Sequence, residues 1–337
     1  MASFRNNTNA DWLLDPLSPH LAAVYTLIAC LAVLGNGMVI TVILLRRQVF
    51  CSFTNRLILH QSIIDCLAGV MFFLHLVVIN AKHISVSIED TLKDQLVCRF
   101  LYSGFALWWV NVTSTYNLVM ISLERFMATC HPVKHRNTWS AAKLKFAVGI
   151  AWATGFIYSA HFVFIAEPHQ GHCRPTELVT SLKIFEASAV ITIEYLVPMT
   201  ILIYTYSQII ITLTKKSANP MNGPRNVMNK AKKNVLVTTL LIGVLFTVFW
   251  TPSEILYICQ LFSGDWDILF YSLITSLLAC NMLVNPIIYC FKYDHFRSEL
   301  RNLVIGRCRR NRVEDGDAIP APAAARRMNT NEAVISL

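Results

Sequence analysis

Long apolar runs, separated by short polar stretches, make up most of the chain. Seven of them approach or exceed the ~20 residues that an α-helix needs to cross a bilayer, and they predict spans over residues 21–45, 57–81, 100–123, 146–166, 187–213, 234–262 and 268–291. Of the formally charged residues, only Asp65, Glu194 and Glu254 lie well inside a run. An ionised side chain at the centre of a membrane helix costs ~2.5–3.5 kcal/mol, so each of these carboxyl groups is expected to have a partner or a function.

The segments outside the spans complete the predicted architecture. Residues 1–20 form a polar tail, residues 21–291 one helical bundle, and residues 292–303 a short amphipathic helix with Arg297 and Arg301 on its polar face. Residues 304–337, rich in Pro and Ala, are expected to be a disordered tail. The chain is therefore predicted to be an all-α membrane protein, a seven-transmembrane helix bundle followed by a membrane-surface helix.

Composition and charge agree with this topology. Apolar residues make up 55% of the 337 residues and charged residues 15%, a membrane composition. Most of the 29 Lys and Arg residues fall on one side of the predicted spans, which by the positive-inside rule is the cytoplasm. The N-terminus is then outside, and the net charge of +9 reflects topology rather than nucleic-acid binding. The expected location is the plasma membrane, with the first span acting as anchor.

Three groups are candidates for covalent modification. Of the ten cysteines, only Cys98 and Cys173 fall in or beside outer loops, so they are expected to form a disulfide, with two free thiols as the alternative. The sequon at Asn6 suits glycosylation of the outer tail. Cys308 follows the amphipathic helix among arginines and is either palmitoylated or a free thiol.

Several motifs occur in order on successive spans. They are GNGMV in the first span, SLERFMATCHP at the inner end of the third, FTVFWTP in the sixth and NMLVNPIIY in the seventh. Together they resemble the rhodopsin-like (class A) G-protein-coupled receptors over about residues 21–303. The matching residues are Asn36, Asp65, Glu124, Arg125, Phe126, Trp152, Pro198, Tyr206, Phe246, Trp250, Pro252, Asn285, Pro286 and Tyr289.

The resemblance implies a polar cluster in the middle of the bundle. Asp65, Ser114, Asn281 and Asn285, with Asn36 nearby, match the group that holds an allosteric sodium ion, at Asp65 and Ser114, in this family. A hydrogen-bonded network with no ion is the alternative. Two residues depart from the family pattern here, because Met282 replaces a small polar residue and Gln61 replaces an apolar one, a turn from Asp65.

The resemblance also implies a signalling mechanism and no enzyme chemistry. Arg125 pairs with Glu124 at rest and meets a heterotrimeric G protein on activation, when the sixth helix swings outward about Pro252 and Tyr206 and Tyr289 turn inward. Arrestins and receptor kinases are expected as further partners. Lys232 stands where some relatives place an acid that locks Arg125, so that lock is expected to be absent.

One spacing departs from the family. Cys98 and Arg125 lie two residues further apart than usual, and the inner part of the third span matches well when counted from Arg125. The extra residues therefore belong to the outer part, where a bulge or a displaced cysteine is expected.

The ligand follows from what the spans lack and contain. No acid lies between Cys98 and Glu124, which argues against an ordinary amine site, and Ala279 replaces the Schiff-base lysine of opsins. By the family resemblance, Glu194 and Glu254 face the ligand cavity, where they favour a cationic group, best supplied by a peptide as in neuropeptide receptors. The alternatives are a small cationic or amine ligand at an unusual site, a lipid, and a transporter or a non-signalling receptor. Either glutamate could instead stay protonated and bond a neighbouring helix. The other candidate ligand contacts are Trp108, His161, Trp250, Tyr257 and Tyr271.

Overall fold

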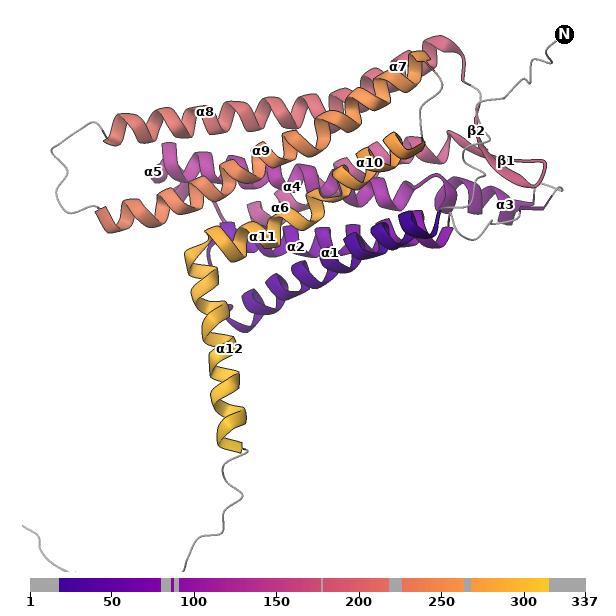
Figure 1. Ribbon diagram of the computed structural model, residues 1–337. Helices are drawn as coiled ribbons and strands as arrows, with labels where there is room; N and C mark the ends of the chain where they lie inside the picture. Colours follow the sequence, from indigo (N-terminus) through magenta and orange to yellow (C-terminus); the bar gives the residue numbers. More distant parts are fainter. Residues whose placement is uncertain are drawn as a thin grey trace, which may run out of the picture.

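The computed structural model describes residues 18–79, 86–87, 91–176, 178–217, 226–263 and 268–314. Within this part of the chain the long helices lie side by side as a bundle, with the hairpin and α3 at one end (Figure 1). The elements are α1 (Pro19–Leu45), α2 (Phe53–Phe73), η2 (Leu74–Ile79), α3 (Leu92–Leu96), η3 (Val97–Tyr102), α4 (Phe105–Cys130), α5 (Pro132–Thr138), α6 (Ala141–Ser159), η4 (Ala160–Val163), β1 (Ala166–His169), β2 (His172–Pro175), α7 (Thr180–Ile191), η5 (Thr192–Leu196), α8 (Val197–Ser217), α9 (Asn226–Ser263), α10 (Ile268–Ala279), α11 (Asn281–Lys292) and α12 (Asp294–Glu314).

Serine side chains cap the first, second and fourth membrane-spanning helices. Ser18, Ser52 and Ser140 cap α1, α2 and α6 by accepting a backbone N–H of the first turn at 3.3 Å in each case. Such a cap satisfies one of the N–H groups that the first turn leaves free. Polar residues just before these three spans therefore carry the signals that start the helices.

The helices extend past the predicted apolar runs at most ends. The third span ends at Cys130 rather than 123, the fifth begins at Thr180 rather than 187, and α9 runs from Asn226 to Ser263. Hydropathy marks only the segment in contact with lipid, whereas a helix continues for as long as its backbone bonds are satisfied. One predicted end is wrong in kind, because Ala166 belongs to strand β1.

Length and apolarity alone identify fewer spans than the fold contains. Four helices of the described chain are long and apolar enough to cross a membrane, or five if the pair Phe270–Ala279 and Asn281–Phe291, bent by 41° at Cys280, counts as one. The third helix, α4, is not among them, since it carries a row of buried polar side chains. From the middle of α4 to its inner end, these residues are Thr113, Ser114, Thr115, Asn117, Ser122 and Glu124.

The buried apolar residues form two main clusters along the bundle. One fills the inner half around Phe246, Trp250 and Tyr289, and Phe296 of α12 packs into it. The other fills the outer half around Tyr25 and Phe72. The polar cluster at Asp65 is built from α2, α4 and α11, helices that contribute to both.

A β-hairpin and a disulfide cover the outer end. Strands β1 and β2 pair antiparallel, with Pro168 opposite Cys173. The predicted disulfide between Cys98 and Cys173 is confirmed, with a Cα–Cα distance of 5.4 Å. It ties the outer end of the third helix to the hairpin that follows the fourth.

The outer third helix shows how the two extra residues are accommodated. Cys98 lies in η3, a π-helical segment that ends at Tyr102, and α4 starts only after Gly104, whose φ is +75°. A π segment takes up additional residues in a helix, and the left-handed conformation of Gly104 is one that a side chain would strain. The expected bulge is therefore present, followed by a turn.

The helix after the last span is longer than predicted. It begins at Asp294 and continues to Glu314, so residues 304–314 are helical rather than part of a disordered tail. Phe296 is buried against Phe50, with ring centroids 6.3 Å apart, and Glu299 pairs with Arg46 at 3.2 Å. These contacts fix the first turns of α12 to the inner ends of α1 and its loop, and the helix then projects from the bundle (Figure 1).

Candidate functional site: an outer cavity, a central polar cluster and an inner network

A cavity of about 250 Å³ opens in the outer half of the bundle. Its wall is formed by residues of α2, η2, α4, α6, η4, α7, η5, α9, α10 and α11. All seven residues that the sequence nominates as ligand contacts line it: Trp108, His161, Glu194, Trp250, Glu254, Tyr257 and Tyr271. The structure thus brings together side chains from five helical segments that the sequence could associate only through the family pattern.

Local backbone chemistry explains why Glu194 points inward. Pro198 has no N–H, and the N–H of Val197 bonds the carbonyl of Thr192, five residues back, which makes η5 a π-helical segment. The carbonyl of Ile193 then receives a bond from the Tyr116 hydroxyl at 2.8 Å. Glu194 lies within this π segment, and its side chain lines the cavity. Single π-helical turns of this kind are frequent at functional sites.

Two carboxyl groups meet in this cavity. Glu194 is 3% exposed and its Oε2 accepts a bond from the Tyr158 hydroxyl at 2.5 Å. Glu254 is 6% exposed. Within the described residues neither Oε1 of Glu194 nor Oε2 of Glu254 has a hydrogen-bond partner. A buried carboxylate oxygen without a donor is costly, so these two atoms are the ones that a ligand can satisfy.

Aromatic rings form the rest of the wall. Trp108 stacks on Phe162 with ring centroids 5.9 Å apart and planes within 6°. His161 contacts the Tyr158 carbonyl through Nδ1, and its Nε2 lies 3.9 Å from Glu186. At the floor of the cavity, Trp250 is buried against Phe246, with ring centroids 5.4 Å apart. Aromatic faces beside carboxylates suit a ligand with both a cationic and an apolar part.

Asp65 lies at the centre of the bundle and is 1% exposed. Its Oδ1 accepts bonds from Ser114 Oγ at 2.7 Å and from Gln61 Nε2 at 2.9 Å, and its Oδ2 accepts one from Asn285 Nδ2 at 2.6 Å. Of the predicted polar cluster, Ser114 and Asn285 therefore bond Asp65 directly.

The other two members of the predicted cluster lie elsewhere. Asn36 donates to the Ala32 carbonyl and to the Met282 carbonyl, both at 2.9 Å, and so joins the first and seventh helices. Asn281 lines the outer cavity.

Apart from Ser114, the side chains that bond Asp65 do so through amide nitrogen atoms, those of Gln61 and Asn285. Hard cations are bound by oxygen atoms, whereas the Gln61 amide nitrogen lies against both assigned ligands, 2.9 Å from Asp65 Oδ1 and 2.6 Å from Ser114 Oγ. Met282 contributes no oxygen from its side chain. The position between Asp65 and Ser114 is taken by an N–H donor.

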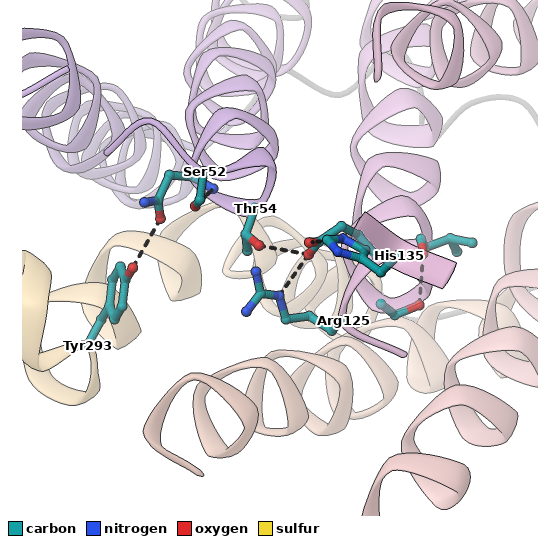
Figure 2. A network of polar contacts seen from close by, with 9 residues as sticks. Ser52, Thr54, Arg125, His135 and Tyr293 are labelled. Carbon is teal, nitrogen blue, oxygen red and sulfur yellow. Dashed lines mark hydrogen bonds and ion pairs between the residues drawn. The ribbon is translucent and has the colours of Figure 1, made fainter. Parts of the chain in front are cut away.

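A network at the inner end surrounds Glu124, which is 2% exposed (Figure 2). Arg125 Nε donates to Glu124 Oε2 at 2.8 Å, and the Thr54 hydroxyl donates to the same atom at 2.7 Å. His135 Nε2 lies 3.0 Å from Glu124 Oε1. Nearby, the Tyr293 hydroxyl donates to Asn55 Oδ1 at 3.0 Å. The predicted pairing of Glu124 with Arg125 is present, and two further groups share the carboxylate.

The remaining residues nominated for activation lie at several depths in the bundle. Tyr206, Phe246 and Tyr289 are buried in the inner apolar cluster, and Phe126 packs on Tyr204 and on the ring of His131. Pro252 and Pro286 lie inside α9 and α11. The side chains of Lys232 and Cys308, and the whole of Asn6, lie outside the described residues.

Several contact residues were not identified from the sequence. They are Tyr158, which holds Glu194, together with Thr54 and His135, which hold Glu124, and the His60–Asn117 pair beside Gln61. The signal available for His60 and Asn117 was a polar side chain within an apolar run. No comparable signal marked Tyr158 or Thr54, because tyrosine and threonine are ordinary residues at these depths.

Comparison with known proteins agrees with this geometry. Residues 35–289 match the family described as 7 transmembrane receptor (rhodopsin family). The chain therefore belongs to the rhodopsin family of seven-transmembrane receptors, which are membrane signalling proteins rather than a class of enzymes.

Three relatives illustrate the level of similarity. Galanin receptor 2b of Danio rerio is 23% identical over 322 residues, 91% of this chain and 81% of that protein. Galanin receptor type 1 of Homo sapiens is 26% identical over 295 residues, 83% of this chain and 80% of that protein. Cephalotocin receptor 2 of Octopus vulgaris is 27% identical over 352 residues, 92% of this chain and 78% of that protein.

Proposed function

We propose that this chain is a receptor for an extracellular peptide with a cationic group, and that it activates a heterotrimeric G protein. The observation that carries the proposal is the pair of buried carboxyl groups, Glu194 and Glu254, on the wall of one aromatic cavity, each with an oxygen that has no partner in the described part of the chain. An ammonium or guanidinium group supplies the donors that these oxygens lack, in charge-assisted hydrogen bonds.

The size of the cavity and the names of the relatives support a peptide. At about 250 Å³ it is slightly smaller than the ~300–1,000 Å³ typical of small-molecule sites, so it suits one end or a few side chains of a larger ligand. Relatives from fish, human and octopus carry the names of galanin and cephalotocin receptors. A small cationic or amine ligand is the second candidate, because the same carboxyl groups would bind it.

Signalling follows from two states with different contacts at the inner end. At rest, Glu124 is bonded by Arg125, Thr54 and His135. A ligand that binds the other state more tightly shifts the population toward it. In that state α9 moves outward about Pro252, Tyr206 and Tyr289 turn inward, and Arg125 is released to the G protein. Arrestins and receptor kinases are further partners proposed for the inner face of the bundle. In this orientation the N-terminus lies outside the cell.

Nucleotide exchange in membranes tests the signalling part of the proposal. Galanin, cephalotocin, other basic and amidated peptides, and biogenic amines would be applied to membranes that hold the receptor and a G protein. We expect one of these ligands to stimulate GTP uptake, and Arg125→Ala to abolish the response while ligand binding persists. Transport of substrate without any exchange would contradict the assignment.

Charge removal tests the ligand part. Glu194→Gln and Glu254→Gln each keep the side-chain shape and remove the charge, so each should raise the half-effective concentration of a cationic agonist ~10–100-fold, the equivalent of ~1.5–3 kcal/mol for a bond to a charged group. Glu167→Gln is the matched control, because Glu167 pairs with Arg174 on the hairpin, outside the cavity. If all three variants respond alike, the cavity carboxyl groups do not bind the cation.

A further inference from the structure

Gln61 belongs to a chain of hydrogen bonds that crosses the bundle. Trp152 Nε1 lies 2.9 Å from His60 Nε2, His60 Nδ1 lies 2.8 Å from Asn117 Oδ1, and Asn117 Nδ2 lies 2.8 Å from Gln61 Oε1. The Gln61 amide nitrogen then contacts Asp65. The side chains of Trp152, His60, Asn117 and Gln61 thus connect α6, the fourth membrane-spanning helix, to the carboxyl group of Asp65.

The two ends of this chain fix its direction. An indole nitrogen only donates, so His60 Nε2 must accept and its Nδ1 carries the proton that is donated to Asn117 Oδ1. Asn117 Nδ2 also donates to the Leu57 carbonyl at 3.2 Å, a group that only accepts. The Asn117 amide is therefore oriented independently at both ends, and Gln61 Oε1 must face it as the acceptor.

This orientation leaves the Gln61 NH₂ group pointed at Asp65 and Ser114. One N–H reaches Asp65 Oδ1 and the other reaches Ser114 Oγ at 2.6 Å, while the Ser114 hydroxyl donates to Asp65 Oδ1. A flipped amide would put its oxygen against the carboxylate and its nitrogen against the Asn117 NH₂ group, which is repulsive at both contacts. Bonds aligned in one direction polarise and strengthen one another.

We propose that the Gln61 amide takes the place of a cation at Asp65, so that the resting receptor does not bind sodium in the middle of the bundle. The partial positive charge of the NH₂ group lies against the two atoms, Asp65 Oδ1 and Ser114 Oγ, that would otherwise ligate the ion. Asn285 supplies the donor for the second carboxylate oxygen. The receptor thereby carries its own fixed substitute for an ion whose concentration varies. The inference does not depend on the identity of the ligand.

Thermal unfolding of the purified full-length receptor tests this without a ligand. Its midpoint would be measured in NaCl and in choline chloride at equal ionic strength, because an ion that binds only the folded state raises the midpoint as its concentration increases. We expect no difference between the salts for the natural chain. We expect Gln61→Leu, which removes the NH₂ group that lies against Asp65 and Ser114, to show a midpoint higher by a few degrees in NaCl.

Three further variants make the result specific. Asp65→Asn added to Gln61→Leu should remove the sodium effect, since the ligand carboxylate is gone. Gln208→Leu makes the same chemical change on α8 and should leave the receptor insensitive to sodium. Gln61→Met also removes the amide, and it would be used in place of Gln61→Leu if the leucine variant does not fold. The proposal is overturned if sodium stabilises the natural chain, if neither folded Gln61 variant gains a sodium effect, or if the gained effect persists without Asp65.

Discussion

The contact between α4 and α6 at Gly155 allows a stability prediction whose size can be worked out from the structure. A Cβ atom added at Gly155 would lie 2.7 Å from the Trp109 carbonyl oxygen and closer still to Thr113 Oγ1, well inside the 3.4 Å at which ordinary contact begins. Thr113 cannot turn away freely, because its hydroxyl donates to that same carbonyl at 2.7 Å. The obstacle is helix backbone, so Gly155→Ala must push α6 from α4.

Gly149 on the same helix provides the matched control. A Cβ at Gly149 meets no atom within 4 Å. Both substitutions gain the same ~0.5–1 kcal/mol of helix propensity, so this contribution cancels when the variants are compared. The remaining difference is the cost of overpacking, about 1–3 kcal/mol.

Thermal unfolding of the detergent-solubilised receptor measures that difference. We expect Gly149→Ala to match or exceed the natural chain, and Gly155→Ala to unfold roughly 2–12 °C below Gly149→Ala, given ~2–4 °C for each kcal/mol in a larger domain. Equal midpoints for the two variants would refute the close approach of α4 and α6 at this position.

Two further predictions concern the two ends of the bundle. His135→Phe keeps the ring packing on Phe53 and Trp139 but removes the contact with Glu124, so basal GTP uptake should rise severalfold, whereas His131→Phe should leave it unchanged; equal rises would contradict the role of His135. At the outer end, bonds from Ser87 and Thr91 lower the pKa of Asp94 to about 2. Because the pKa of Asp94 is lower in the folded loop, its ionisation stabilises the fold at pH values above the ordinary pKa of an aspartate. This stabilisation is lost as the pH falls through the pKa that Asp94 has in the folded state. Amide hydrogen exchange at Ser87 and Thr91 should therefore stay protected down to about pH 4 and lose protection below it, and Asp94→Asn should weaken protection throughout; protection that fades near neutral pH would refute this.

The sequence was sufficient for the architecture because the bilayer imposes simple requirements on it. The apolar runs and the family motifs together gave the spans, and the side of the membrane left only Cys98 and Cys173 as disulfide partners. The family pattern then placed Glu194 and Glu254 in one cavity, which the structure reproduces.

What the sequence could not supply were contacts between helices. Gln61 was visible as a polar residue near Asp65, but the direction of its amide depends on Asn117, His60 and Trp152, which lie on three helices and were unconnected until the fold was known. The pairing of Tyr158 with Glu194 depends on η5, and a π segment is set by a missing N–H and the availability of the Tyr116 hydroxyl to replace it.

Tyr158 also determines how Glu194 presents its carboxyl group to a ligand. With its hydroxyl 2.5 Å from Oε2, the carboxyl group is held before any ligand arrives. An incoming donor can bond Oε1, which has no partner among the described residues, while the Tyr158 bond to Oε2 persists. A donor with a full positive charge gains more there than a neutral one, because it interacts with the whole carboxylate. Tyr158 thus orients the carboxylate before binding, so little further ordering of this side chain accompanies the arrival of the ligand.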